Sequence, residues 1–540
     1  MERWSSGLCR TEGVEYMNAS TSLAREIVRQ IIEAGITDVV ISPGSRNAPL
    51  SLAFNAAAER GFIKLHIRID ERTAAFFALG LIKSTGRQVP VVCTSGTAVA
   101  NYHPAVLEAN HTNAPLLVLT ADRPAMLRRT GANQTTEQAR IFGKAVRYFA
   151  DVDGSVFPME LPLDSLRFGP VHINLQFDEP LLPDVATGWL DEIKVSPILF
   201  KPRRKIATLK VQVSRGVLVI GHDRGGLSVE EVANFAKKLG WPVITEDPLS
   251  FPDAIAHASI FLTSPQVRSN LVPQAVIVIG RTTLSRSINI LIGLAPASFV
   301  IDPRIASVDS DRRGDKRFTQ IPALEASSAS DEWIAQWRKY SARCAKLISE
   351  VNGWNEASIA KVIAASIPNG AALFVSSSRP IRDLEGFATP RSGLTTYANR
   401  GLAGIDGNIS TALGIASGHA QTFAVLGDLA FLHDITGLIQ SENINCRFIV
   451  INNDGGGIFS TLPQRGVAGF ETVFGTPHGL DPAAIAQALG ISASTITSID
   501  ELKQVLTSPV KGISVVVAKV QSREANANNL KSIYEKMDSI

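Results

Sequence analysis

The chain has 540 residues, of which 45% are hydrophobic and 19% are charged, a composition typical of a folded protein of several domains and not of a disordered one. Its formal net charge of +3 is too small for a general nucleic-acid-binding protein, which concentrates basic residues on one face. The four cysteines (Cys9, Cys93, Cys344 and Cys446) are far apart and form no C-x-x-C pair, which argues against a zinc site or a disulfide framework and suits a reducing cytoplasm.

The N-terminal segment 1–16 has no hydrophobic core of the kind that a signal peptide needs. It is predicted to be an irregular extension, with Met17 as an alternative start. The longest apolar stretch, INILIGLAPASFVI, is shorter than the roughly 18 residues of a membrane span and is interrupted by small residues. We therefore expect a soluble cytoplasmic protein.

Short apolar runs that end in glycine, serine, aspartate or asparagine recur in chain order. They are TDVVISPGSR, VPVVCTSGTA, APLLVLTADRP and FGPVHINLQ, then GVLVIGHDRGG, WPVITEDP, QAVIVIGR and SFVIDPR, and finally AALFVSSSRP, GLTTYANRG, TFAVLGDLA, FIVINNDGGG and GISVVVAKV. Nearly continuous Val/Ile/Leu runs separated by helix-length segments indicate strands that are buried on both faces of parallel sheets. The prediction is an α/β protein of three successive parallel-sheet domains.

The domain boundaries are expected where the composition shifts. Leu190–Lys210 is charged and contains proline, and Arg304–Ser330 is charged and then rich in serine, so both segments are predicted to be surface linkers. The three predicted domains are 17–190, 200–330 and 340–540. Ligands of open parallel sheets bind beyond the carboxyl ends of the strands, and the first and last domains have most of the polar strand ends.

Two polar strand ends in the last domain predict a metal and phosphate site. Asp428 follows one strand and Asn453 follows the next, 25 residues later (453 − 428), which leaves room for one crossover helix. A carboxylate and an amide oxygen on adjacent strands suit Mg²⁺, and the glycines at 455–457 allow a phosphate to approach the backbone and leave a free carbonyl for the metal. The alternative is that Asn453 and Asp454 merely cap a following helix. No G-x-x-x-x-G-K-[ST] motif occurs, so a P-loop is not predicted.

The pair GD and NN in these two strand ends resembles the diphosphate and metal motif of thiamine diphosphate enzymes, with Leu429 where a glycine is common. That resemblance requires a glutamate in the first domain that shares a proton with the cofactor's pyrimidine. Glu71, in HIRIDERTAAFFALG, lies at a predicted strand-to-helix junction under apolar residues that would raise the pKa of its carboxyl group. Alternatively, Glu71 is a helix-start carboxylate favoured by the helix dipole.

Longer motifs resemble one family. ISPGSRNAPL, DERTAAFFALG, TSGTAVANYHPAVLEA, TADRPAMLRRTGANQTT, NRGLAGIDGNIST and NNDGGGIFSTLPQ are similar to the 2-succinyl-5-enolpyruvyl-6-hydroxy-3-cyclohexene-1-carboxylate synthases of menaquinone biosynthesis, from about Ser22 to Ser522. The resemblance implies a transferase of the transketolase type. It would use thiamine diphosphate and Mg²⁺ or Mn²⁺ to decarboxylate 2-oxoglutarate and add the succinyl carbanion to isochorismate. It also implies a homodimer or homotetramer with active sites shared between chains.

The same resemblance implies roles for individual residues. Glu71, Arg382 and Arg400 would be catalytic. The cofactor would be bound by Glu71, Thr94, Ile405, Gly427, Asp428, Leu429, Asn453, Gly455, Gly456, Ile458 and Phe459. The metal would be bound by Asp428, Asn453 and Gly455. Ser378, Arg382 and Arg400 would face the 2-oxoglutarate-derived part, while Ser45, Arg46, Arg123, Asn133, Gln134 and Arg286 would surround isochorismate, and Leu462 would complete an apolar wall.

Both implied substrates are dianions, and arginine is the residue best suited to bind carboxylates in a bidentate way. Two other functions are weighed against the synthase. One is another thiamine-dependent 2-oxoacid decarboxylase or carboligase, which the SPGSR and NRG segments argue against. The other is a non-catalytic binding subunit, which would have no need of Glu71 or Asp428.

Overall fold

The computed structural model describes residues 18–154, 160–183, 188–197, 206–304, 314–439 and 442–538. The predicted apolar runs form strands in three separate parallel sheets, so the predicted α/β fold is confirmed. The first sheet has six strands in the order β2-β1-β3-β4-β6-β5. Its strands are β1 (Asp38–Ile41), β2 (Lys64–Ile67), β3 (Val89–Cys93), β4 (Leu116–Asp122), β5 (Tyr148–Val152) and β6 (Val171–Gln176). Its helices are α1 (Ala19–Glu33), α2 (Ala48–Glu59), α3 (Glu71–Thr85), α4 (Thr97–Asn101) and α5 (His103–Thr112).

The middle sheet has five strands in the order β12-β11-β10-β8-β9, and a separate two-stranded sheet pairs β13 with β7. The strands are β7 (Thr208–Val211), β8 (Gly216–Ile220), β9 (Val243–Thr245), β10 (Ala275–Ile279), β11 (Ala297–Ile301), β12 (Lys316–Phe318) and β13 (Ala323–Ala326). The helices of this part are α6 (Val229–Leu239), α7 (Ala258–Phe261), α8 (Pro265–Asn270), α9 (Arg286–Leu294) and α10 (Asp331–Glu350). Trp333 and Trp337 of α10 are buried in the apolar core of this middle part.

The last sheet repeats the strand order of the first. Counted along the chain, the order β15-β14-β16-β17-β19-β18 is again second, first, third, fourth, sixth, fifth. Its strands are β14 (Ala372–Val375), β15 (Thr395–Tyr397), β16 (Thr422–Gly427), β17 (Cys446–Asn452), β18 (Ser492–Ile496) and β19 (Ile513–Lys519). Its helices are α11 (Glu356–Ser366), α12 (Arg379–Phe387), α13 (Asn408–Ala416), α14 (Asp428–His433), α15 (Pro482–Ala488), α16 (Ile499–Thr507) and α17 (Arg523–Asp538).

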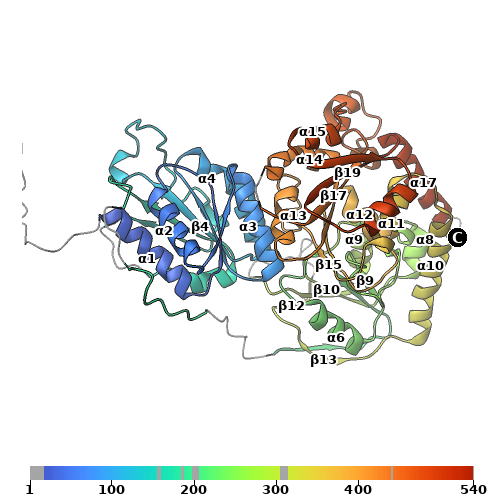
Figure 1. The fold of residues 1–540 in the computed structure, drawn as a ribbon. Helices are drawn as coiled ribbons and strands as arrows, with labels where there is room; N and C mark the ends of the chain where they lie inside the picture. The colour runs from blue at the N-terminus through green and yellow to red at the C-terminus, as the bar shows by residue number, and fades with distance from the viewer. Residues whose placement is uncertain are drawn as a thin grey trace, which may run out of the picture.

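Helices α3 and α13 join the first and last parts of the chain and lie side by side (Figure 1). Glycines allow the two backbones to meet, because a Cβ at Gly80 would be 2.2 Å from the carbonyl oxygen of Thr411, and one at Gly414 would be 2.1 Å from that of Phe77. One continuous apolar core contains residues of both sheets and both helices. Side chains larger than glycine at this crossing would push the two sheets apart.

The strands that the sequence did not reveal are short and partly exposed. β5, β12, β13 and β18 have several exposed residues each, and β5, β12 and β18 lie at sheet edges, so they lack the continuous apolar run of a central strand. The prediction that Arg304–Ser330 is a linker was wrong for its described part, because β12 and β13 lie there, and β7 occupies the end of the other predicted linker. The three domain ranges remain a prediction.

Three of the four cysteines (Cys93, Cys344 and Cys446) are buried and free, while Cys9, Met17 and the extension 1–16 lie outside the described residues. Within the described ranges, no helix is both long enough and apolar enough to cross a membrane.

Candidate active site

Asp428 and Asn453 meet at the carboxyl edge of the last sheet, as their spacing predicts. β16 and β17 are adjacent and parallel, Asp428 begins α14 directly after β16, and Asn453 follows β17. The buried Asp428 carboxylate accepts hydrogen bonds from the backbone N–H groups of Asn453 at 3.1 Å, Gly455 at 2.9 Å and Leu429 at 2.7 Å. Burial raises the pKa of Asp428 above its ordinary value, while these hydrogen bonds act in the opposite direction. The carboxylate is thus fixed in position against the start of the glycine-rich turn.

Only one end of the Asn453 side-chain amide has a hydrogen-bond partner. Its amide nitrogen donates to Glu356 Oε1 at 2.7 Å, whereas its Oδ1 atom is buried without a hydrogen-bond partner among the described residues. A buried acceptor left unpaired costs about 1–3 kcal/mol, and a hard cation that prefers oxygen ligands would satisfy it. The helix-cap alternative is not observed, because the Asp454 carboxylate accepts from the N–H groups of His478 and Gly479.

The glycine-rich turn after β17 is packed too closely for side chains. A Cβ at Gly455, whose φ is +130°, would be 2.1 Å from the Gly475 carbonyl oxygen, and one at Gly456 would be 2.2 Å from that of Phe474. The turn forms one wall of a cavity of about 180 Å³. Apart from the first-domain residues Glu71 and Thr94, every residue predicted to bind the cofactor lines this cavity: Ile405, Gly427, Asp428, Leu429, Asn453, Gly455, Gly456, Ile458 and Phe459.

Ser378 also lines this cavity and has a strained backbone conformation. Its φ of 73° and ψ of −125° are rare for a residue with a side chain, and such strain costs on the order of 1–3 kcal/mol. The carbonyl oxygen of Ser378 accepts a hydrogen bond from Arg382, one turn further along α12. This strained turn therefore sets the direction in which Arg382 leaves the helix.

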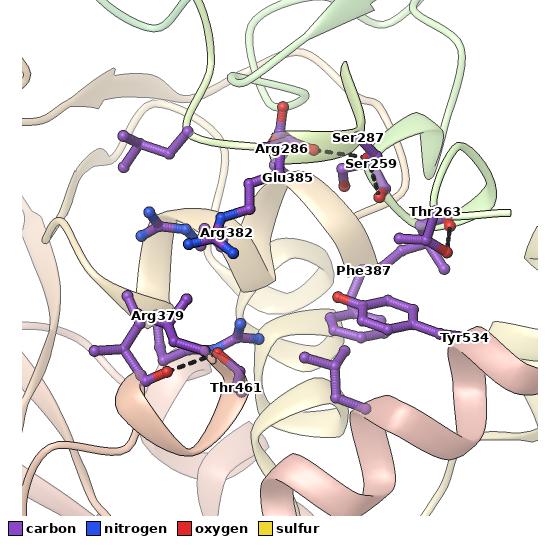
Figure 2. Close-up of a pocket in the computed structure, with 16 residues that line it drawn as sticks. Ser259, Thr263, Arg286, Ser287, Arg379, Arg382, Glu385, Phe387, Thr461 and Tyr534 are labelled. Carbon is purple, nitrogen blue, oxygen red and sulfur yellow. Dashed lines mark hydrogen bonds between the residues drawn. The ribbon is translucent and has the colours of Figure 1, made fainter. Parts of the chain in front are cut away.

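A second cavity, of about 300 Å³, lies between the middle and last parts of the chain (Figure 2). Arg286, at the start of α9, and Arg382, from α12, both line it, together with Leu462 and Ile458. Burial and the neighbouring Arg379 lower the pKa of Arg382. The sequence predicted that Arg286 and Arg382 bind different substrates, and the structure brings them to one cavity.

Arg400 occupies a different position from the other predicted arginines. Its buried guanidinium group donates from Nε and Nη2 to the two carboxylate oxygens of Glu246, at 3.0 and 2.8 Å. Glu246 follows β9 of the middle sheet and also accepts the backbone N–H of Leu284 at 2.8 Å. Arg400 lines neither of the two cavities above, so its contact with substrate stays a prediction.

The first sheet brings a second group of predicted residues together at its own carboxyl edge. Arg123 donates from Nη1 to the Ser95 hydroxyl at 2.7 Å and to the Gln134 carbonyl at 2.6 Å. Burial and the positive charge of Arg46 lower the pKa of Arg123. Thr94 packs directly against Gly44, next to Ser45. Ser45, Asn133 and Gln134 are exposed.

Glu71 is the first residue of α3, and Asp70 caps that helix by accepting from the N–H groups of Arg72 and Thr73. Partial burial raises the pKa of Glu71, with a smaller contribution from the charge of Asp70. The residues on either side fix the start of the helix to the last domain, since Asp70 accepts from the Thr436 hydroxyl at 2.6 Å and Arg72 donates to the His433 carbonyl at 2.8 Å. Glu71 is therefore a helix-start residue whose carboxyl group has a raised pKa, and its part in proton transfer stays a prediction.

The sequence did not predict the buried hydrogen bonds beneath the loop that contains Asn133 and Gln134. Gln138, which is 0% exposed, accepts the Gly96 N–H at 3.0 Å and donates to Asn174 Oδ1 at 2.8 Å. Asn174 in turn donates to Asp122 and Asp151, and Arg128 bridges the same two carboxylates. The available signal was the polar residue Asn174 within the apolar strand sequence VHINLQ.

Comparison with known proteins identifies the three parts of the chain. Residues 21–141 match the family model of the N-terminal TPP binding domain of thiamine pyrophosphate enzymes, residues 188–375 match their middle domain, and residues 383–518 match their C-terminal TPP binding domain.

Whole-chain relatives share one name, 2-succinyl-5-enolpyruvyl-6-hydroxy-3-cyclohexene-1-carboxylate synthase. The protein from Thermobifida fusca is 37% identical over 96% of this chain and 99% of its own length. The protein from a Nocardioides species is 38% identical over 93% of this chain and 95% of its own length. The protein from Lysinibacillus sphaericus is 32% identical over 96% of this chain and 98% of its own length.

Proposed function

The chain belongs to the 2-succinyl-5-enolpyruvyl-6-hydroxy-3-cyclohexene-1-carboxylate synthase family of thiamine pyrophosphate enzymes, and we propose that it catalyses the reaction of that family. In this reaction, 2-oxoglutarate loses carbon dioxide and the remaining four-carbon unit adds to isochorismate. When bound, thiamine diphosphate supplies the nucleophilic carbon and the electron sink for both steps. The chain supplies binding, orientation and proton transfer.

The observation that best supports this proposal is the pairing of Asp428 with the unsatisfied Asn453 Oδ1 in a glycine-lined cavity. One carboxylate and one free amide oxygen are the donors that Mg²⁺ or Mn²⁺ prefers, and the diphosphate would complete its ligands. Gly455 would provide a third, carbonyl ligand. Ile405, Ile458 and Phe459 line the same cavity and would exclude water from the reacting end of the cofactor.

We further propose that each active site uses two chains, as a homodimer or a homotetramer. The cavity at Asp428 is lined by residues 377–459 and by none of the first domain. The groups that shift the pKa of Glu71 belong to the first domain, while those that shift the pKa of Asp428 belong to the last domain. A second chain would bring its Glu71, with Arg46, Arg123 and Gln134, to the open side of this cavity. Glu71 would then hold the proton that the pyrimidine gains and loses.

The arginines support the choice of dicarboxylate substrates. Arg286 and Arg382 line one cavity, and Arg46 and Arg123 both follow strands at the carboxyl edge of the first sheet. Two pairs of guanidinium groups suit two dianionic substrates better than they suit a 2-oxoacid with an uncharged side chain. The buried free cysteines are compatible with a cytoplasmic location, which remains part of the proposal.

The test is an assay with thiamine diphosphate and Mg²⁺ in which 2-oxoglutarate is supplied with and without isochorismate. Carbon dioxide release from 2-oxoglutarate together with formation of the adduct supports the proposal. Decarboxylation of pyruvate or a branched 2-oxoacid in its place would assign the chain to another thiamine-dependent activity. Absence of turnover with every 2-oxoacid would indicate a binding subunit.

A further inference from the structure

The cavity that contains Arg286 and Arg382 also contains a buried carboxyl group for which the proposed reaction gives no role. Glu385, on α12, is 4% exposed and lines this cavity. Neither of its carboxyl oxygens has a hydrogen-bond partner among the described residues. The Thr283 hydroxyl approaches the carboxyl group, but without hydrogen-bonding geometry. A buried polar group without a partner is costly, so its presence calls for a ligand.

The charges around Glu385 come from several elements. Arg382 lies one turn earlier on α12, Glu246 and Arg400 form their bidentate pair nearby, and Arg286 lines the cavity from α9. Tyr534 of α17 lines the cavity as well. Arg379 is already paired with Asp383, and Arg400 with Glu246. No arginine or lysine of the described chain forms an ion pair with Glu385 within 4.0 Å, whereas the other buried carboxylates of this region have such partners.

These surroundings favour the neutral acid. Burial, and then the negative charge of Glu246, raise the pKa of Glu385 well above its ordinary value, against the smaller opposite effects of the nearby Thr283 hydroxyl, Arg400 and Arg382. A protonated carboxylic acid differs from a carboxylate in that it donates one hydrogen bond.

We propose that Glu385 is a specificity-determining residue that stays protonated and donates a hydrogen bond to a carboxylate of the dicarboxylate substrate in this cavity. The proposal rests on the proposed function for the identity of that substrate. Two guanidinium groups and a neutral acid match the two negative charges of a dicarboxylate. An ionised Glu385 would add a third negative charge at a buried position, where repulsion between charges is stronger than in water.

Two variants separate this role from a structural one. Glu385→Gln keeps the size of the side chain and one N–H donor but cannot ionise, whereas Glu385→Leu keeps the volume and removes the donor. We expect the KM for 2-oxoglutarate to rise about 10- to 100-fold in Glu385→Leu, because a hydrogen bond to a charged group is lost. In Glu385→Gln, the KM at neutral pH should stay within about threefold of the wild type.

The pH dependence of the KM for 2-oxoglutarate should differ between the wild type and Glu385→Gln. As the pH rises through the raised pKa, only the wild type loses its donor and gains a repelling charge, so the ratio of its KM to that of Glu385→Gln should increase. A ratio that stays constant from about pH 6 to about pH 10 would overturn the proposal. So would a KM for Glu385→Leu that equals the wild-type value, or a KM for Glu385→Gln far below it at neutral pH.

Thermal unfolding tests the protonation state without turnover. Because the pKa of Glu385 is raised in the folded chain, the folded state keeps a proton that the unfolded state releases as the pH rises above the ordinary range of glutamate. The wild type should therefore lose stability relative to Glu385→Gln as the pH rises from about 4 to about 8. A Tm difference independent of pH would show that Glu385 is not held protonated. If the wild type failed to turn over 2-oxoglutarate, the proposed function and its substrate would fail, and this measurement would still decide the protonation state.

Discussion

The first and last sheets have the same strand order, but the polar groups at their carboxyl edges are hydrogen-bonded differently. At the edge of the first sheet, Arg123 is hydrogen-bonded to Ser95 and Gln134, and Gln138 is paired beneath them, while Ser42 Oγ, Arg46 Nε and Asn47 Oδ1 are buried without partners among the described residues. At the edge of the last sheet, Asn453 keeps a buried oxygen without a partner, and a glycine-rich turn borders a cavity. At the first edge, hydrogen bonds within the chain hold the loop of Asn133 and Gln134, whereas the last edge borders a cavity that a ligand can fill.

This difference suggests a division of labour between two similar folds. The hydrogen-bonded side chains of the first edge are held in fixed directions, which suits the recognition of a substrate and the positioning of Glu71. An edge with unsatisfied oxygens next to a cavity suits a metal and a diphosphate. The two edges become one active site only if a second chain brings them together, as proposed above.

The largest effect is expected from Glu71→Gln at the first edge. The amide keeps the size of the side chain but cannot exchange a proton with the pyrimidine, so turnover should fall by roughly 10²–10⁴-fold. Binding of thiamine diphosphate, measured by calorimetry, should change little. Near-normal turnover in this variant would remove Glu71 from the reaction.

Asp428→Ala, at the edge of the last sheet, should impair binding of the cofactor, in contrast to Glu71→Gln. It removes one predicted metal ligand and the acceptor of three backbone N–H groups, so Mg²⁺-dependent binding of thiamine diphosphate should weaken by more than about 100-fold. Calorimetric titration at fixed Mg²⁺ measures this directly. Unchanged affinity would place the metal elsewhere.

Arginine variants sharpen the comparison by testing one half-reaction at a time. Arg382→Ala should slow decarboxylation of 2-oxoglutarate even without isochorismate, by about 10- to 150-fold, because a hydrogen bond to a charged group contributes about 1.5–3 kcal/mol. Arg123→Ala should spare that step and impair the capture of isochorismate by a similar factor. Single-turnover decarboxylation followed by an isochorismate chase resolves the two steps. Equal slowing of decarboxylation in both variants would contradict this assignment.

Arg286→Ala decides how the cavity shared by Arg286 and Arg382 is used. The sequence-based assignment predicts that this variant also spares decarboxylation and impairs the capture of isochorismate. Since both guanidinium groups line one cavity, the alternative outcome is slow decarboxylation in both variants, measured in the same single-turnover experiment. That outcome would assign Arg286 to 2-oxoglutarate.

The smallest effect is expected from Gln138→Leu beneath the first edge. It leaves the Gly96 N–H without its acceptor, and an unsatisfied buried group costs about 1–3 kcal/mol, while Asn174 Oδ1 keeps its hydrogen bond from the Thr120 hydroxyl. The free energy of unfolding should fall by a few kcal/mol, measured by denaturant titration. We also expect the KM for isochorismate to rise more than that for 2-oxoglutarate, because the loop with Asn133 and Gln134 loses its anchor. Equal changes in both KM values would indicate a purely structural role.

The sequence predicted the structure best where a residue pattern has a single physical explanation. Central strands were predictable from continuous apolar runs, and Asp428 and Asn453 from their spacing on adjacent parallel strands. Edge strands such as β5 and β18 were not predictable, because their exposed residues do not repeat an apolar pattern. The pairing of Arg400 with Glu246 joins two residues 154 positions apart, a contact that no local pattern encodes. The unpaired oxygens of Asn453 and Glu385 depend likewise on what surrounds them in space.

The shared active site is tested most directly by a heterodimer purified from co-expressed, differently tagged Glu71→Gln and Asp428→Ala chains. If each site takes Glu71 from one chain and Asp428 from the other, one of the two sites contains both wild-type residues. The heterodimer should then recover about half of the wild-type turnover, although each homodimer is inactive. If Glu71 and Asp428 of the same chain worked together, both sites would contain one altered residue. A heterodimer as inactive as the two parent variants would contradict the shared site.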